Sequence, residues 1–237
     1  MDHASWTGTS IQVRSVYIAP IGSGASGAPS ILTVGTVTQS LSKYGQIKVY
    51  NFASGALSFA DDDAWQFPTS DTEGLSVFAG QFDGSHTDVT ACGSYISSGN
   101  LKAGVEIYRW NSGAGTIDQR NYYVWRDVGV TTTQCRGVFG ADLAGATGVE
   151  IAAGGYALIS GTENGEVRTF NYDGGTNPAT SFTNVQYTDW TLSGNTRVNA
   201  VFCGNVDGNA IVQFVTAGQA TDAGGTLNGQ LRVWHLS

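Results

Sequence analysis

Short runs of apolar residues, each ended by glycine or a polar turn, recur along the chain and predict β-strands. The clearest group lies between Gly74 and Trp110, where three such runs follow one another closely. The first run is almost continuously apolar, which is typical of a strand that is covered on both faces. The third alternates apolar and polar positions and ends on an aromatic residue. No segment of ten or more residues has the 3.6-residue period of an amphipathic helix, so the pattern predicts an all-β protein.

The same group of runs occurs four times, in the same order, in steps of 61, 61 and 63 residues. The first runs are VYIA at 16–19, VFAG at 77–80, VFGA at 138–141 and VFCG at 201–204. The second runs all end on glycine: SILTVG at 30–35, DVTACG at 88–93, EIAAGG at 150–155 and QFVTAG at 213–218. The third runs end on Tyr50, Tyr108, Phe170 and Trp234, and each copy is preceded by a tryptophan, at positions 6, 65, 125 and 190. A repeat of this length indicates a propeller or a solenoid.

We predict a single β-propeller domain over 1–237, with four blades of four antiparallel strands. The repeats cover approximately 6–64, 65–124, 125–189, and 190–237 together with 1–5. The last repeat stops after its third strand, so we expect the N-terminal segment to join the last blade as its missing outer strand. This would close the circle of blades and remove free sheet edges. We expect a monomer, and the alternative is an eight-bladed circle made by two chains.

Composition narrows the classes of partner. The chain has 33 glycines in 237 residues, about twice the ordinary share, and they fall at strand ends where turns are needed. The net charge is −8 and no basic run occurs, which argues against nucleic acid as a partner. No apolar stretch approaches the ~18 residues of a membrane span, so we expect no membrane insertion. Cys92, Cys135 and Cys203 have neither disulfide nor zinc spacing, and we expect them to be buried.

The turn between the first and second runs carries a family resemblance. In the second repeat, VFAGQFDG is followed by DVTACG. This pattern resembles the FG-GAP/VCBS repeats of integrin α-type propellers and of archaeal and bacterial surface proteins. The resemblance implies a propeller fold, an extracellular or cell-surface location, and calcium-binding loops with closely spaced oxygen ligands.

The residues that match the family's calcium loop are Asp83, Asp88, Asp142, Asn205 and Asp207. Calcium takes six to eight oxygen ligands, and each loop here lacks some of them: Gln81 and Ala144 stand where the family has carboxylates. The alternative is that these Asp-Gly and Asn-x-Asp-Gly sequences form only Asx-type turns. We therefore expect no cofactor, with calcium as the one candidate.

No catalytic motif occurs: both G-x-S-x-G and H-E-x-x-H are absent, and we assign no catalytic residue. The sequence favours a non-catalytic binding or scaffold propeller that presents loops to a protein or glycan partner, and a lectin-like protein is the most concrete version. Candidate loop residues are Tyr95, Tyr122, Tyr123, Tyr156 and Asp222. The alternative is a hydrolase or lyase that acts on polysaccharide, because a fold can assemble paired carboxylates that sequence spacing does not reveal.

Overall fold

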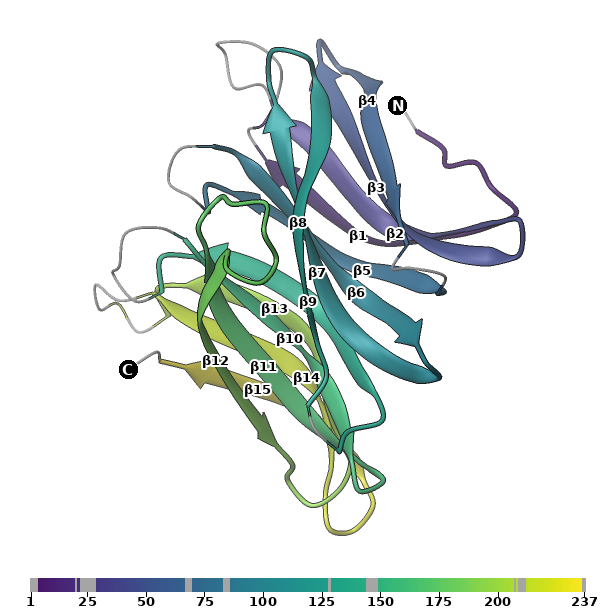
Figure 1. Ribbon diagram of the computed structural model, residues 1–237. Coiled ribbons are helices and arrows are strands. Elements are labelled where there is room, and N and C mark those ends of the chain that lie inside the picture. The colour runs from purple at the N-terminus through teal and green to yellow at the C-terminus, as the bar shows by residue number, and fades with distance from the viewer. Residues whose placement is uncertain are drawn as a thin grey trace.

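The computed structural model describes residues 4–19, 21, 29–66, 70–82, 86–127, 129–143, 149–206, 208 and 212–235. Within these residues the chain forms fifteen β-strands and no helix. The strands make four antiparallel sheets, arranged as the four blades of a β-propeller (Figure 1). The predicted all-β class and four-bladed architecture are confirmed. The described residues contain no helix that could cross a membrane.

In every blade the strands pair in chain order, starting from the first. Blade 1 consists of β1 (Ser10–Ala19), β2 (Ser30–Gln39), β3 (Ser42–Ala53) and β4 (Ala56–Trp65). Blade 2 consists of β5 (Thr72–Gly80), β6 (Asp88–Ser97), β7 (Asn100–Asn111) and β8 (Thr116–Trp125). Blade 3 consists of β9 (Thr133–Ala141), β10 (Glu150–Ile159), β11 (Thr162–Tyr172) and β12 (Phe182–Trp190). Blade 4 has three strands, β13 (Thr196–Gly204), β14 (Gln213–Thr221) and β15 (Leu227–Trp234).

The glycine that ends each second run has a steric reason. The first strand of every blade carries a bulge at the same place, and the bulge presses a backbone carbonyl against the second strand. A Cβ added at these glycines would lie only 1.7 to 2.1 Å from that carbonyl oxygen. The four pairs are Gly35 with Gln12, Gly93 with Glu73, Gly155 with Gln134, and Gly218 with Arg197. Only glycine allows this close approach of two backbones.

The hydrophobic core lies between successive blades. Three clusters fill the spaces between blades 1 and 2, blades 2 and 3, and blades 3 and 4. Each first strand carries an aromatic residue at the same position, and this residue packs on its counterpart in the next blade. The ring centroids are 5.0 Å apart for Tyr17 and Phe78, 4.3 Å for Phe78 and Phe139, and 4.7 Å for Phe139 and Phe202. The three cysteines are buried and free, as expected.

The predicted N-terminal closing strand is wrong. Among the described residues blade 4 has three strands, and residues 4–6 lie against blade 1 instead. The Trp6 ring is 5.5 Å from the Lys48 ammonium, and Ala4 and Ser5 line a shallow hollow with Lys48 and Tyr50. The first and last strands lie at opposite ends of the molecule (Figure 1). Among the described strands the closest packing joins successive blades, and one ring contact, between Tyr17 and Phe139 at 6.3 Å, joins blades 1 and 3. Residues 4–6 therefore do not join the last blade of their own chain, and residues 1–3 lie outside the described residues.

Candidate ligand-binding site

Asp88 and the residues at its position in the next two repeats, Glu150 and Gln213, each form a hydrogen bond with a neighbouring protein group. Asp88 is fully buried, and its Oδ1 accepts a hydrogen bond from Arg109 Nε at 3.0 Å. Glu150 Oε2 accepts the backbone N–H of Leu143 at 2.7 Å. Gln213 Oε1 accepts the backbone N–H of Val206 at 2.8 Å. In blades 3 and 4 this residue thus anchors the preceding turn, and in blade 2 it forms an ion pair across two strands.

The remaining predicted ligands do not come together in the described structure. Asp142 is exposed. Asn205 Oδ1 accepts the backbone N–H of Gly208 at 2.8 Å, which is the Asx-type turn that was the alternative prediction. Asp83 and Asp207 lie outside the described residues. In the part of the chain that is described, no group of three or more His, Cys, Asp or Glu residues is placed to hold a metal ion.

The loop residues considered for glycan binding have mostly structural roles. Tyr95 is buried, and Tyr123 packs in the core between blades 2 and 3. Tyr156 lies under the guanidinium of Arg197, 5.1 Å from ring centroid to Cζ. Asp222 accepts backbone N–H groups of Thr226 and Gly224 at 2.9 Å, and these bonds, that of Thr226 first, hold its pKa below the ordinary value. Of the four tyrosines, Tyr122 is the most exposed.

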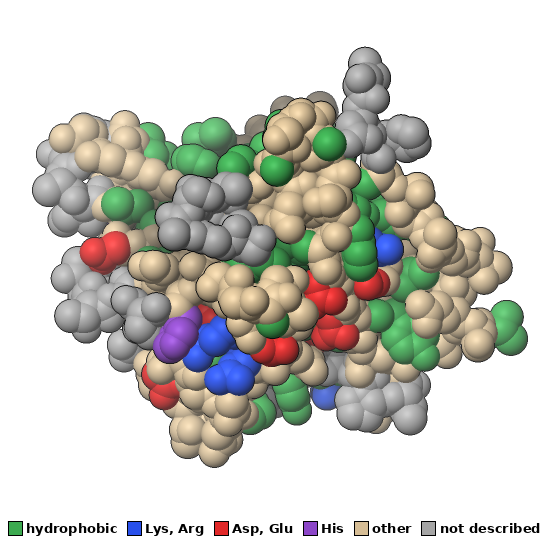
Figure 2. Space-filling view, turned by 90° about the horizontal axis from the view of Figure 1, so that it is seen from above, with side chains coloured by type: hydrophobic (Ala, Val, Ile, Leu, Met, Phe, Trp, Pro, Cys, Tyr) green, Lys and Arg blue, Asp and Glu red, His purple; other side chains and the backbone are tan. Residues whose placement is uncertain are grey.

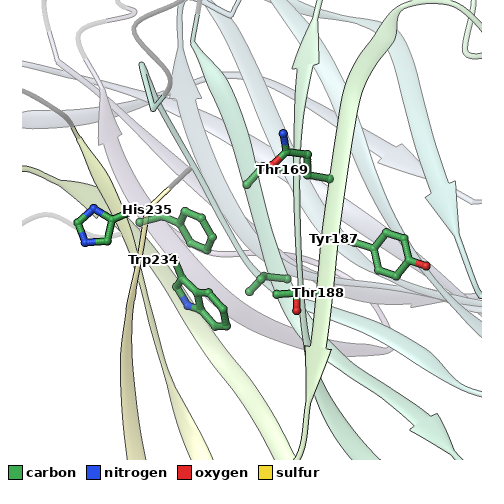
Figure 3. A pocket seen from close by; sticks show the side chains of 8 residues that line it. Thr169, Tyr187, Thr188, Trp234 and His235 are labelled. Carbon is green, nitrogen blue, oxygen red and sulfur yellow. The ribbon is translucent and has the colours of Figure 1, made fainter. Parts of the chain in front are cut away.

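A hollow that the sequence did not predict lies between blades 3 and 4 (Figure 3), with a volume of about 140 Å³. Its blade 3 side comes from β11 and β12, and its blade 4 side from β14 and the end of β15. The lining residues are Val167, Thr169, Gln186, Tyr187, Thr188, Phe214, Trp234 and His235. We refer to this hollow as the blade 3–4 cleft. Figure 3 shows the Trp234 side chain on the cleft side of β12 and the Tyr187 ring on the opposite side of that strand. Tyr187 contributes to the lining from that strand, and its ring packs over Arg168 at 4.6 Å.

The cleft exists because two groups that fill the matching space between blades 2 and 3 are missing here. In that space Tyr123 packs against Phe170 and Phe182, with both ring centroids at 5.3 Å. Thr188 occupies the position in β12 that Tyr123 occupies in β8, and it is much smaller. Blade 4 also has no described strand after β15 to carry a counterpart of Phe182.

The Trp234 indole is held in place by its neighbours. Its Nε1–H donates to Thr216 Oγ1 at 3.0 Å, and the ring stacks on Phe214 with a centroid distance of 5.8 Å and an interplanar angle of 8°. Trp190 packs against it at 4.9 Å. Because these contacts fix the indole before any ligand arrives, little conformational entropy would be lost on binding.

The cleft offers aromatic surface, two hydroxyls, an amide and an imidazole, and no carboxylate is among its lining residues. These groups suit a neutral ligand that has one apolar face and several hydroxyls. They do not include the pair of carboxylic acids that glycoside hydrolysis uses.

A carboxyl with a strongly raised pKa lies elsewhere, between blades 1 and 2. Burial raises the pKa of Glu106 to about 8, against the opposing effect of a 2.9 Å hydrogen bond from Gln119 Nε2, and the nearby Asp63 adds to the increase. Glu106 is only 2% exposed, so it has no access to a substrate. On the surface, Figure 2 shows acidic side chains beside a smaller group of basic ones on the upper face, without a wide patch of one sign.

Comparisons with known proteins do not assign this chain to a family. No protein-family model matches the chain, and no curated protein matches it. Among solved structures, the crystal structure of Sqt1 from Chaetomium thermophilum matches with 8% sequence identity and a TM-score of 0.28, over 95% of this chain and 72% of that chain. At this level the similarity bears on neither fold nor function. The class of the protein therefore follows from the structure itself: a β-propeller with a candidate ligand cleft between two of its blades.

Proposed function

We propose that this protein is a non-catalytic binding propeller that holds one sugar ring of a glycan in the blade 3–4 cleft. The observation that carries the proposal is the fixed indole of Trp234 on the cleft side of β12, opposite Thr188 (Figure 3). A sugar ring has a face of C–H groups, which packs on an aromatic ring, and hydroxyls at its edge, which need hydrogen-bond partners. Thr188, Gln186 and His235 provide such partners around the indole.

The size of the cleft limits the ligand. Pockets for drug-sized molecules usually measure roughly 300 to 1,000 Å³. The cleft has about 140 Å³, so it accommodates a single small ring, and the rest of a longer glycan would lie on the surface. Binding of this kind is weak for one site, and a protein that presents several copies gains strength through avidity.

Two further properties agree with the proposal. Charged residues make up only 13% of the chain, so uncharged polar groups supply much of its hydrogen-bonding surface. The resemblance to FG-GAP/VCBS repeats suggests an extracellular or cell-surface location, where glycans are available. A polysaccharide-acting enzyme is the less favoured function because no carboxylate lines the cleft.

The experiment is a glycan array, followed by calorimetric titration of the best sugar with the parent chain and three variants. Thr188→Tyr should fill the cleft as Tyr123 fills the matching space, and Trp234→Ala should remove the stacking surface. We expect both to weaken binding by at least about tenfold, a loss of ~1.4 kcal/mol. Tyr122→Ala is the control, because this exposed tyrosine does not line the cleft, and it should bind normally.

An array without any sugar hit would refute the glycan proposal. Undiminished binding by a folded Thr188→Tyr variant would show that the sugar binds elsewhere on the protein.

A further inference from the structure

The outer face of blade 4 exposes apolar residues at positions that are buried in every other blade. Leu231 is 69% exposed, whereas the matching residues of the third strands, Ile47, Val105 and Val167, are 0 to 3% exposed. Val233 and Phe202 on the same face are exposed as well. In blades 1 to 3 this face packs against the following blade. The outer face of blade 4 is therefore half of a blade–blade interface.

The other half of such an interface is present on blade 1. Val16 is 62% exposed, whereas the matching residues Val77, Val138 and Val201 are 3 to 8% exposed and pack on the preceding blade. Ile18 in the same strand is also exposed. The chain thus carries both complementary halves of the interface that it forms three times internally, and they lie at opposite ends of the molecule (Figure 1).

A tryptophan–glycine contact points to the same conclusion. Trp65 at the end of β4 lies opposite Gly45, and Trp190 at the end of β12 lies opposite Gly165. A Cβ at Gly45 would lie 2.3 Å from the Trp65 ring, and one at Gly165 would lie 2.9 Å from Trp190. Gly229 occupies the matching position in β15, but a Cβ there would meet nothing within 4 Å. Blade 4 has the glycine without its tryptophan.

Trp6 is in the converse situation. The repeated tryptophans also contact the third strand of the following blade, as Trp190 does with Arg232 at 4.7 Å. Trp6 makes this contact with Lys48 on blade 1. It therefore occupies the position that a tryptophan from a preceding blade would take on blade 1.

We propose that a second copy of this chain covers both open faces, the outer face of blade 4 and the exposed face of blade 1. Blade 4 of each copy packs on blade 1 of the other, and Trp6 of one copy covers Gly229 of the other. Residues 4–6 extend along β15 opposite residues 229–231, by the register in which β12 pairs with β11. Two chains then close a circle of eight blades. The predicted role of the N-terminal segment as the missing strand of blade 4 is thereby fulfilled between chains.

A second copy fits these faces better than an unrelated partner. The two open faces continue the interfaces already formed inside the chain, and a symmetric pair buries both of them at once. The residues at the edges of the two open faces are also compatible with each other. By the repeat, Leu227 would meet Gln12 of the second copy, which matches the uncharged pair Leu101 and Gln134 between blades 2 and 3. Residues 4–6 would pair with residues 229–231 in the middle of β15, and none of these residues lines the blade 3–4 cleft.

The first test is the molar mass in solution, measured by light scattering after size-exclusion chromatography. The parent chain should have about 50 kDa, twice the 24.8 kDa of one chain. Gly229→Val should reduce the mass to that of one chain without changing the circular dichroism spectrum, because the added side chain has room until Trp6 of the partner arrives. Gly165→Val is the contrasting variant, and it should destabilise the fold because Trp190 already covers that site.

The second test is cross-linking of two variants that each gain one exposed cysteine, Ala4→Cys and Leu231→Cys, while the three native cysteines are buried. Mixed together under oxidation, they should give a covalent heterodimer. Leu41→Cys, at an exposed hairpin end, should give none with Leu231→Cys. A folded parent of 24.8 kDa, open polymers, or the absence of a covalent heterodimer from Ala4→Cys and Leu231→Cys would each overturn the proposal.

Discussion

The buried Glu106 should make the stability of this protein fall as the pH rises. Its pKa of about 8 in the folded chain lies roughly 3.5 above the 4.5 of an unperturbed glutamic acid. At ~1.36 kcal/mol for each pH unit, this difference corresponds to about 5 kcal/mol of unfolding free energy. Because the folded state holds the proton more tightly than the unfolded state, the stabilisation is complete below pH 4.5. It is lost progressively as the pH rises to 8.

Glu106→Gln isolates this effect because the amide keeps the shape of the acid and its hydrogen-bonding capacity while removing the charge. We expect the parent and the variant to unfold with similar free energies at pH 4. At pH 9 the variant should be the more stable by up to about 5 kcal/mol. The assay is urea denaturation followed by circular dichroism at pH 4, 6, 8 and 9.

The control is Asp118→Asn, which removes the same charge at an exposed position of β8 and should reproduce the pH profile of the parent. The informative quantity is the difference between the pH profiles of the parent and Glu106→Gln, because the other titrating groups affect both of these proteins alike. Parallel profiles for parent and Glu106→Gln from pH 4 to pH 9 would show that Glu106 is ionised at no cost, and the reasoning from burial would be refuted.

Three further predictions concern the loops and the bulges. Arg109→Met should lower the unfolding free energy by about 3 to 5 kcal/mol, because it takes the cation away from the fully buried Asp88, and the double change with Asp88→Asn should restore part of the loss in chemical denaturation. Gly93→Ala should lower the melting temperature far more than Gly99→Ala, since a Cβ at Gly93 would meet a carbonyl oxygen at 1.8 Å whereas the space around Gly99 is open. Calcium should leave the melting temperature unchanged, because Asp88 and Glu150 are already engaged by protein groups, and a rise with added calcium would contradict this account of the loops.

The repeat made the architecture predictable because the constraints are local and recur. Each glycine that ends a second run, such as Gly93, is fixed by a bulge in the strand beside it. The closing strand was mispredicted for a physical reason: a repeated tryptophan such as Trp190 contacts two blades, and the sequence does not show that Trp6 contacts blade 1 alone within its chain.

The candidate site was less accessible to sequence reasoning, because it results from what is absent. A cleft forms where Thr188 replaces the larger Tyr123 and where no described strand after β15 carries a counterpart of Phe182. An alignment of the outer strands across repeats could have shown the first difference. The tyrosines favoured from sequence failed for another reason: residue type does not reveal the direction of a side chain, and Tyr95 points into the core.

The tryptophans at the ends of the outer strands also affect how the chain opens. Trp190 is paired with blade 3 through its backbone, while its ring rests on blade 4. Each such residue ties the folding of one blade to that of the next, so that inner blades cannot unfold without disturbing a neighbour. Cooperativity of this nearest-neighbour kind is typical of repeat proteins. Blades 1 and 4 of a single chain each have a neighbour on one side only, and blade 4 has three described strands where blade 1 has four, so amide hydrogen exchange should begin in blade 4.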